Sequence, residues 1–253
     1  MSNIGIIGCG WLGSRIAEKL SDGHTLYCTT TSPDKVEGFN AKGYHPAIID
    51  FDKEDKTQDQ SVWNAPDSLE ILIVTVTLSG KRMDDAILEK RFRNLSSFIG
   101  DFKGQLFFMS STGVYPDLSE VFTEDDLQPE QVPGENMIRA RYPKANVLRL
   151  GGLMGDSRLL SRYRISATEL PVNHIHYADI AAVVEKMISL HSEGKLYNVV
   201  APLHPSKAAV ISAQQNGPDQ ELHEPKGRTI SSSRLIEDLN YQFIFPDPRF
   251  FHV

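Results

Sequence analysis

Three glycines near the start of the chain have the spacing of a loop that binds phosphate groups. They belong to the segment Gly-Cys-Gly-Trp-Leu-Gly at 8–13, which follows an apolar run at 4–7 and precedes an amphipathic helical pattern at 12–20. Glycine at these positions permits a tight turn, close approach of the backbone to a pyrophosphate, and close packing of helix on strand. The first N–H groups of the helix then face the phosphates. The segment predicts a dinucleotide site contacted by Gly8, Gly10, Trp11, Leu12 and Gly13.

Two other interpretations of this glycine segment stay open. A strand-to-helix turn can be rich in glycine without binding a ligand, and a methyltransferase uses a similar loop to bind S-adenosylmethionine. The position of the motif directly between a buried strand and an amphipathic helix favours the dinucleotide.

The end of the second expected strand decides which dinucleotide fits the site. Proteins that bind NAD usually place an Asp or Glu there, and its carboxylate holds the ribose 2′-hydroxyl. This chain has Cys-Thr-Thr-Thr-Ser at 28–32 and no acidic residue before Asp34. Neutral hydroxyl groups tolerate a 2′-phosphate, and Lys35 could approach it. We therefore expect NADP in preference to NAD, held by Thr30, Thr31 and Ser32, although these residues could instead form only a strand edge and a turn.

A second group of hydroxyl side chains follows the fifth expected strand, in the segment Met-Ser-Ser-Thr-Gly-Val-Tyr at 109–115. Ligands of open α/β sheets bind beyond the carboxyl ends of the strands, so these hydroxyls would face a cofactor. They could equally satisfy the unpaired backbone groups of a turn at the strand end. The segment alone does not decide between these two roles.

Strand-like and helix-like patterns alternate along the first 150 residues. We expect strands at 4–7, 24–30, 47–50, 69–77, 105–109 and 146–150, and helices at 12–20 and 84–99. A further helix is expected from Asp179 and a further strand at 196–200, whereas the tail from Ala201 is expected to be irregular. Alternating strands and helices with right-handed crossovers give a parallel sheet. The prediction is an α/β fold, a Rossmann-type doubly wound parallel sheet of about seven strands with a small C-terminal lobe.

The expected dinucleotide-binding core covers 1–150, and 176–200 returns to it, while 151–175 and 201–253 form a small substrate-side lobe. The formal net charge of −7 suits a nucleic-acid backbone poorly. Two cysteines are too few for a disulfide scaffold, and no Cys/His cluster indicates a metal site. The longest apolar run is far shorter than a membrane span. We expect a cytoplasmic monomer or homodimer with a small-molecule substrate, without a metal, nucleic-acid or membrane partner.

Together, the glycine loop and the hydroxyl-rich segment resemble the extended short-chain dehydrogenase/reductase superfamily. The most similar branch contains the atypical NAD-dependent epimerase/dehydratase-like proteins, which include nucleoside-diphosphate-sugar epimerase-like proteins. The resemblance continues through the segments at 148–155, 175–181, 197–200 and 233–241. Their order along the chain is more specific than any single segment.

This resemblance implies roles for several further residues. Ser111 falls where the family has its catalytic Ser or Thr. Apart from the resemblance, Tyr115 is the next candidate for moving a proton by its sequence distance from Ser111, and His174 follows because imidazole titrates near neutral pH. Asp50 and Phe51 would contact the adenine ring. The cofactor channel would be lined by Thr75, Val76, Ser110 and Gly152, and the substrate would be bordered by Thr112, Tyr115, Leu153 and Asn173.

The chain departs from the family at its proton relay, a Tyr followed four residues later by a Lys that lowers the pKa of the phenol. The corresponding helix opens within 128–138, a stretch that contains neither Tyr nor Lys. Tyr142 and Lys144 are only two residues apart, which is the wrong spacing. Two hypotheses follow. The protein is an NADP-dependent oxidoreductase or sugar-nucleotide-modifying enzyme with a non-standard acid/base, or it is a dinucleotide-binding sensor or scaffold without catalysis.

Overall fold

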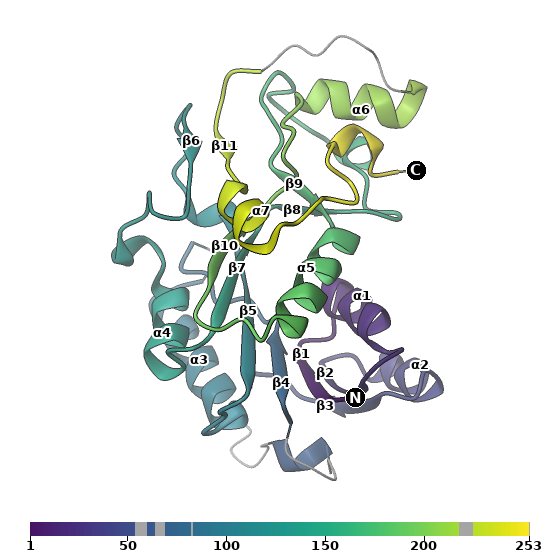
Figure 1. The fold of residues 1–253 in the computed structure, drawn as a ribbon, viewed down its shortest axis with the longest axis vertical. Coiled ribbons are helices and arrows are strands. Elements are labelled where there is room, and N and C mark those ends of the chain that lie inside the picture. Colours follow the sequence, from purple (N-terminus) through teal and green to yellow (C-terminus); the bar gives the residue numbers. More distant parts are fainter. Residues whose placement is uncertain (54–59, 64–68, 82, 218–224, 253) are drawn as a thin grey trace. The chain divides into compact units, whose positions relative to one another are not determined.

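The computed structural model describes residues 1–53, 60–63, 69–81, 83–217 and 225–252. Within these residues the main sheet has seven strands in the order β10-β7-β5-β4-β1-β2-β3 (Figure 1). β1 pairs in parallel with β2 and β4, β2 with β3, and β4 with β5. The predicted α/β fold with a seven-stranded parallel sheet is therefore confirmed. The strands are β1 (Asn3–Ile7), β2 (Thr25–Thr30), β3 (His45–Ile48), β4 (Ile71–Val74), β5 (Gln105–Ser111), β7 (Asn146–Leu150) and β10 (Leu196–Val199).

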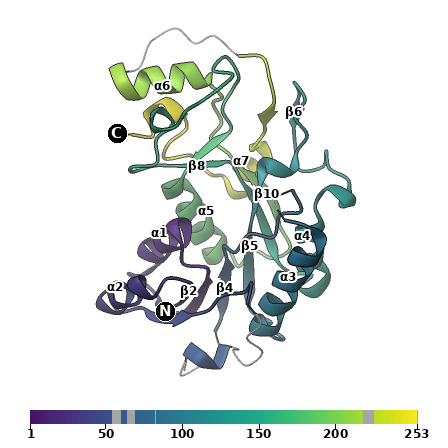
Figure 2. The ribbon, with the colours of Figure 1, turned by 180° about the vertical axis from the view of Figure 1, so that it is seen from behind.

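The chain divides into two compact units. Unit 1 comprises Met1–Ser110, Gln128–Val147 and Met187–Lys195, and unit 2 comprises Ser111–Leu127, Leu148–Lys186 and Leu196–Val253. In unit 1, α3 and α4 lie side by side in both ribbon views (Figures 1 and 2). The role of a substrate lobe for 151–175 and 201–253 stays a prediction. The helices of unit 1 are α1 (Trp11–Leu20), α2 (Val36–Ala41), α3 (Asp85–Ile99) and α4 (Pro133–Arg141), with the short 3₁₀ turns η1 (Pro33–Lys35), η2 (Gln60–Trp63) and η4 (Pro129–Gln131).

Unit 2 contains two small parallel strand pairs, β6 (Val121–Phe122) with β11 (Thr229–Ile230) and β8 (Gly152–Met154) with β9 (His174–His176). The tail from Ala201 is more regular than predicted, because it forms two helices. One of these, α6, packs next to the 3₁₀ turns η5 and η6. The helical elements are η3 (Thr112–Val114), η5 (Leu160–Arg162), α5 (Tyr177–Ser189, its last residues in unit 1), α6 (Lys207–Asn216), α7 (Ser233–Leu239) and η6 (Pro248–Phe250).

The core of unit 1 follows from the periodicity of its apolar side chains. All four residues of β4 are buried, as expected for a strand covered on both faces. α1 buries one stripe that includes Ile16 and Leu20, four residues apart. α3 begins where the carboxylate of Asp84 accepts a hydrogen bond from the N–H of Ile87 at 2.9 Å. These elements direct the loops that follow β1, β2, β3 and β4 to the carboxyl edge of the sheet.

Several predicted boundaries differ from the structure. The fourth strand covers Ile71–Val74 instead of 69–77, and the hydroxyl of the next residue, Thr75, donates to the carbonyl oxygen of Gly8 in the glycine loop. The third strand covers His45–Ile48 instead of 47–50. α5 begins at Tyr177 instead of Asp179, whose carboxylate accepts hydrogen bonds from distant backbone N–H groups, such as that of Ile244 at 2.7 Å.

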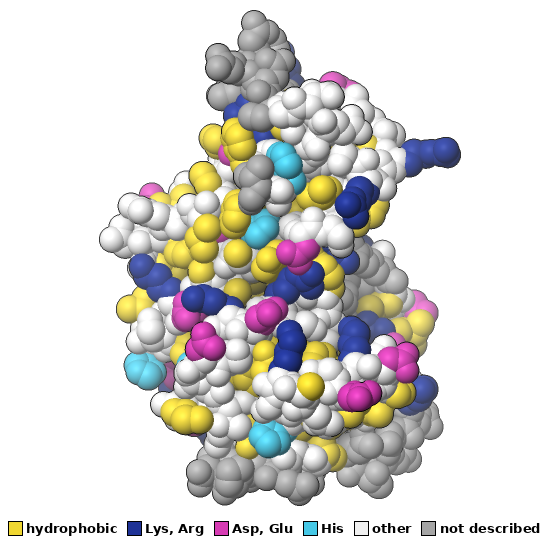
Figure 3. Space-filling view, turned by 90° about the vertical axis from the view of Figure 1, so that its right-hand side faces the viewer, with side chains coloured by type: hydrophobic (Ala, Val, Ile, Leu, Met, Phe, Trp, Pro, Cys, Tyr) yellow, Lys and Arg dark blue, Asp and Glu magenta, His cyan; other side chains and the backbone are white. Residues whose placement is uncertain are grey.

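The surface of unit 1 mixes charges of both signs. On its α1 and α2 side, Figure 3 shows Lys and Arg side chains beside Asp and Glu side chains. Lys42 and Glu18, for example, lie 3.6 Å apart there. Among the described residues, no helix combines the length and the apolar character needed to cross a membrane.

Candidate functional site

The glycine loop joins β1 to α1, and its three glycines are needed for different reasons. Gly8 has a φ of +92°, and a Cβ there would lie 2.8 Å from Oγ1 of Thr75. A Cβ at Gly13 would lie 2.8 Å from the carbonyl oxygen of Gly8, so α1 could not pack as closely on the loop. A Cβ at Gly10 would have the carbonyl oxygen of Gly8 as its nearest neighbour, 3.8 Å away. Gly10 is therefore the position where a side chain would obstruct a ligand without disturbing the loop.

Hydrogen bonds hold the glycine loop against its neighbouring strands. Gly8 N donates to Oγ1 of Thr29 at 2.8 Å, and Cys9 N donates to the carbonyl oxygen of Thr29 at 2.6 Å. The Thr75 hydroxyl donates to the carbonyl oxygen of Gly8. No side chain caps the N-terminus of α1 at Gly10. The first N–H groups of α1 are consequently suited to bind an anion.

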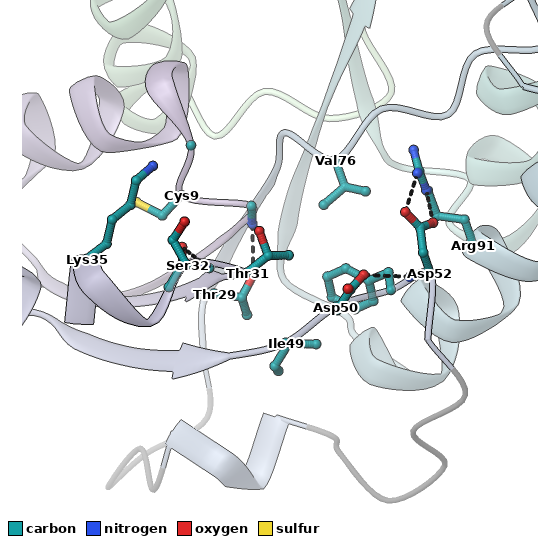
Figure 4. Close-up of a pocket in the computed structure, with 14 residues that line it drawn as sticks. Cys9, Thr29, Thr31, Ser32, Lys35, Ile49, Asp50, Asp52, Val76 and Arg91 are labelled. Atoms are coloured by element: carbon teal, nitrogen blue, oxygen red, sulfur yellow. Dashed lines mark hydrogen bonds and ion pairs between the residues drawn. The ribbon is translucent and has the colours of Figure 1, made fainter.

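A cavity of about 260 Å³ lies beside this loop in unit 1 (Figure 4). It is bounded by the loop, the end of β2, the segment after β3 and one residue each from the β4 end and α3. Eight predicted cofactor-binding residues come together there, although their binding role stays a prediction. The lining residues are Gly8, Cys9, Gly10, Thr29, Thr30, Thr31, Ser32, Lys35, Ile49, Asp50, Phe51, Asp52, Val76 and Arg91.

The part of this cavity nearest to β2 presents hydroxyl groups and one ammonium group, those of Thr31, Ser32 and Lys35 (Figure 4). Thr30 is only 5% exposed, and its Oγ1 accepts a hydrogen bond from Ser32 N at 3.2 Å. Thr31 is exposed. Of the predicted threonines, Thr31 is therefore the better placed to meet a ligand with its side chain.

The opposite part of the cavity is built from the residues after β3. Phe51 is buried, with its ring edge-on to Phe98 and the centroids 5.6 Å apart. Arg91 donates from Nε and Nη2 to the two carboxylate oxygens of Asp52, at 2.6 Å each (Figure 4). This ion pair holds the pKa of the Asp52 carboxyl below its usual value. Sequence analysis missed Asp52 and Arg91, because 39 residues separate them and no local pattern joins them.

Five predicted cofactor contacts of unit 1 do not line this cavity: Trp11, Leu12, Gly13, Thr75 and Ser110. Leu12 is buried in the core, and the guanidinium of Arg15 lies 4.0 Å from the centroid of the Trp11 ring. Gly13 and Thr75 instead shape the glycine loop, as described above.

Ser110, at the end of the part of β5 that belongs to unit 1, has a partner that sequence analysis missed. Its hydroxyl donates to Oε1 of Glu135 on α4 at 2.6 Å. Glu135 is only 4% exposed. It lies inside the 128–138 segment, which contains neither Tyr nor Lys.

In unit 2, the hydroxyl groups that follow Ser110 differ in accessibility. Ser111 is exposed, and its Oγ accepts a hydrogen bond from Gly113 N at 3.1 Å. Thr112 is buried, and its hydroxyl donates to the carbonyl oxygen of Leu150 at 3.3 Å. Of these two residues, Ser111 is the one that a substrate could reach, and the contacts of Thr112 are structural.

Tyr115 belongs to a buried polar cluster of unit 2, which we define as Tyr115, Glu124, Arg149 and Asn198. The Tyr115 hydroxyl accepts a hydrogen bond from Nη1 of Arg149 at 2.9 Å and lies 2.7 Å from Oδ1 of Asn198. Glu124 accepts a hydrogen bond from Asn198 N at 2.7 Å. Burial raises the pKa of Tyr115, which opposes formation of a phenolate. This geometry gives Tyr115 a packing role and speaks against its predicted roles in proton transfer and substrate contact.

The other predicted residues of unit 2 surround β8 and β9. A Cβ at Gly152 would lie 2.5 Å from Cδ2 of His174, so the imidazole occupies the space above this glycine. Burial lowers the pKa of His174 to about 4, and its Nδ1 has no hydrogen-bond partner within the described part of the chain. The side-chain amide of Asn173 bonds to two backbone groups: it donates to the carbonyl oxygen of Arg228 and accepts from Ile230 N. Leu153 pairs with Ile175 across the two strands.

Comparison with known proteins places this geometry in a wider context. No model of a known protein family matches the chain. Protein YeeZ of Escherichia coli (strain K12) is 24% identical over an alignment of 277 positions, which covers 98% of each chain.

Several solved structures share the fold over nearly the whole chain. The dTDP-glucose 4,6-dehydratase from Bacillus anthracis in complex with NAD has a TM-score of 0.74 and 12% identity, over 98% of this chain and 94% of that one. The human epimerase family protein SDR39U1 with NADPH has a TM-score of 0.66 and 16% identity, over 97% of this chain and 96% of that one. The predicted resemblance to epimerase/dehydratase-like short-chain dehydrogenases/reductases is thereby confirmed at the level of the fold.

Proposed function

We propose that this protein binds a nicotinamide dinucleotide, NADP in preference to NAD, and acts as an oxidoreductase or a sugar-nucleotide-modifying enzyme of the epimerase/dehydratase-like type. The observation that carries the proposal is the cavity beside the glycine loop. Two proteins of the same fold are known with NAD and with NADPH. When bound, the cofactor would supply hydride transfer at its nicotinamide ring.

The residues around the cavity fit such a cofactor. The loop at Gly8–Gly10 and the uncapped N-terminus of α1 would hold the pyrophosphate. The adenine ring would lie near Asp50 and Phe51. The 2′-phosphate would meet Thr31, Ser32 and Lys35, since 28–33 contains no carboxylate that would repel it.

The direct test is calorimetric titration of NADP⁺ and NAD⁺ into the wild type and Gly10→Val. Because a Cβ at Gly10 meets no protein atom closer than 3.8 Å, the variant should fold while its side chain obstructs the pyrophosphate. We expect an affinity loss of about a hundredfold, in line with mutations that displace a charged ligand from its backbone donors. The matched control is Gly23→Val, since a Cβ at Gly23 has no neighbour within 4 Å and lies outside the loop. Equal affinity of Gly10→Val and wild type would overturn the cofactor assignment.

The remaining parts of the proposal concern the substrate and the setting of the protein. We expect a small polar or nucleotide-linked substrate that meets Ser111, with His174 in its neutral form as a hydrogen-bond acceptor. Tyr115 is not part of this proposal because its hydroxyl is committed to the buried polar cluster. A cytoplasmic monomer or homodimer without a nucleic-acid partner remains the expectation from composition and charge.

A second candidate function is a dinucleotide sensor or scaffold without catalysis. The absence of Tyr and Lys from 128–138 favours it, because general acid–base catalysis is typically worth about 10²–10⁴ in rate. A turnover screen with sugar nucleotides, small alcohols and carbonyl compounds separates the two functions. Tight NADP⁺ binding without any turnover would support the sensor. Turnover that falls in Ser111→Ala or His174→Ala would support the enzyme.

A further inference from the structure

In unit 1, the buried carboxylate of Glu135 lies beside the side chain of Ser110 near the carboxyl edge of the sheet. Ser110 is partly exposed, whereas Glu135 is 4% exposed, and the serine hydroxyl donates to Glu135 Oε1 at 2.6 Å. The short hydrogen bond leaves lone pairs on the serine oxygen that can accept a further hydrogen bond. A ligand hydroxyl at this edge would therefore meet a serine that is already connected to a carboxylate.

The strand order places this pair on the far side of the glycine loop from the proposed adenosine site. The cavity lies over β1, β2 and β3, while Ser110 is the second-last residue of β5, which is two strands from β1 in the order β5-β4-β1. Two strand spacings correspond to about 10 Å. A dinucleotide with its pyrophosphate on the loop after β1 extends its second half over β4 and β5. The reacting end of the cofactor would therefore lie near Ser110.

Close backbone packing positions Glu135 at this edge. Glu135 is the third residue of α4, and a Cβ on the preceding Gly134 would lie 2.1 Å from the carbonyl oxygen of Leu78. A Cβ at Gly80 would similarly lie 3.0 Å from Cγ of Pro133. The first turn of α4 thus rests directly on the segment that leaves β4. The hydrogen bond from Ser110 then holds the Glu135 carboxylate beside the C-terminal part of β5.

We propose that Ser110 and Glu135 form the proton relay that replaces the missing Tyr and Lys, an inference that rests on the proposed function. In the oxidative direction, Ser110 accepts the proton of the substrate hydroxyl while its own proton passes to Glu135. The C–H bond of the same carbon breaks as its hydride goes to the nicotinamide of NADP⁺. The alcohol becomes a carbonyl, NADP⁺ becomes NADPH, and the proton remains on the Glu135 carboxyl. Ser110 is thus a catalytic residue, and Glu135 acts through it.

The first measurement of the test compares the affinities of NADP⁺ and NADPH, because only the oxidised nicotinamide ring carries a positive charge. A carboxylate near that ring favours the oxidised form, so Glu135→Gln should raise the ratio of the NADP⁺ to the NADPH dissociation constant at least about threefold. A purely structural role of Glu135 would change both constants equally. The control is Glu130→Gln, the same substitution at an exposed residue of η4, which should leave the ratio unchanged.

The second measurement is the reduction of a panel of small ketones and aldehydes by NADPH. Ser110→Ala and Glu135→Gln should each lower kcat about 10²–10⁴-fold with a smaller change in KM, and Glu135→Asp should recover part of the loss. If the wild type binds neither dinucleotide, the proposed function fails and the relay fails with it. If both forms bind but Glu135→Gln keeps the wild-type ratio, or the panel yields no turnover, the relay is overturned and the binding function stands.

Discussion

Two groups of polar residues, one in each unit, have opposite surroundings. In the cavity of unit 1, Thr31, Ser32 and Lys35 face empty space beside an uncapped helix N-terminus. In the buried polar cluster of unit 2, Tyr115 and Arg149 are no more than 3% exposed and are hydrogen-bonded to each other, and the Tyr115 hydroxyl also bonds to Asn198. Buried polar groups that bond to one another stabilise the fold, whereas polar groups around a cavity can bind a ligand. Residue type alone does not distinguish these two situations.

Substitutions in the buried polar cluster should therefore lower the stability of the fold more than substitutions around the cavity. Arg149→Leu would leave the Tyr115 hydroxyl and the backbone carbonyl of Glu124 without their arginine donor, which lies 2.9 Å and 3.1 Å away, respectively. We expect a loss of about 3–5 kcal/mol in the free energy of unfolding, measured by urea denaturation. The control is Arg141→Leu, since the Arg141 side chain is 45% exposed. Equal losses in the two variants would contradict the structural role of the cluster.

The contrast between the two regions also explains which residues sequence analysis could identify. The glycine loop was predictable because its requirements are local: Gly8 needs a positive φ, and Gly13 must pack on Gly8 within the same turn. The burial of Tyr115 depends on Arg149 and Asn198, which are 34 and 83 residues away. No periodicity or spacing within 109–115 predicts partners that are so distant in sequence.

The same reasoning applies to the fold and to the remainder of the site. Alternating buried strands and amphipathic helices predicted the parallel sheet, since each pattern is contained in a short window. The predicted strand end and helix start differ from Val74 and Tyr177 by a few residues, and side chains next to both boundaries bond to backbone that is distant in sequence, which no local pattern contains. The pairing of Ser110 with Glu135 spans 25 residues and depends on how α4 packs. Sequence analysis named Ser110 without finding its partner.

His174 is an intermediate case between the two regions, because it is half-buried and its Nδ1 has no hydrogen-bond partner among the described residues. Its pKa is lowered to about 4 from the 6.5 of an unfolded chain. As the pH falls, the unfolded state therefore takes up a proton before the folded state does. The contribution of the neutral imidazole to the free energy of unfolding is fully present above pH 6.5 and is lost as the pH falls toward 4. Over this interval the wild type should lose about 2 kcal/mol more than His174→Gln.

The measurement is urea unfolding at pH 7, 5.5 and 4.5 for both proteins. His191→Asn serves as the control, because His191 is exposed and has a φ of +49°, which Asn tolerates. This control should follow the wild-type pH profile. Parallel profiles for wild type and His174→Gln would show that the imidazole is not held neutral by burial.

In the cavity, a substitution should change ligand affinity more than stability. Lys35→Ala removes the ammonium group proposed to meet the 2′-phosphate, so the NADP⁺ affinity should fall about tenfold, or about 1.4 kcal/mol, with NAD⁺ affinity unchanged. Thr31→Asp should act in the same direction by placing a carboxylate against the phosphate. Calorimetry with both dinucleotides measures the ratio. Lys42→Ala, which removes a lysine paired with Glu18, is the control. A wild-type preference for NAD⁺ would refute the assignment.

The smallest effect on stability is expected at the ion pair of Asp52 and Arg91 in the wall of the cavity. Asp52 and Arg91 form two 2.6 Å hydrogen bonds, yet the Asp52 side chain is 52% exposed, so water screens the attraction. Asp52→Asn should cost less than about 1 kcal/mol of stability, well below the loss for Arg149→Leu. Because the pair lowers the pKa of the Asp52 carboxyl, its contribution is present above the unfolded value of 3.8 and declines as the pH falls below it. Urea unfolding at pH 7 and pH 3 tests both points. A loss as large as that of the buried cluster would show that the geometry of an ion pair, and not its exposure, determines its contribution to stability in this fold.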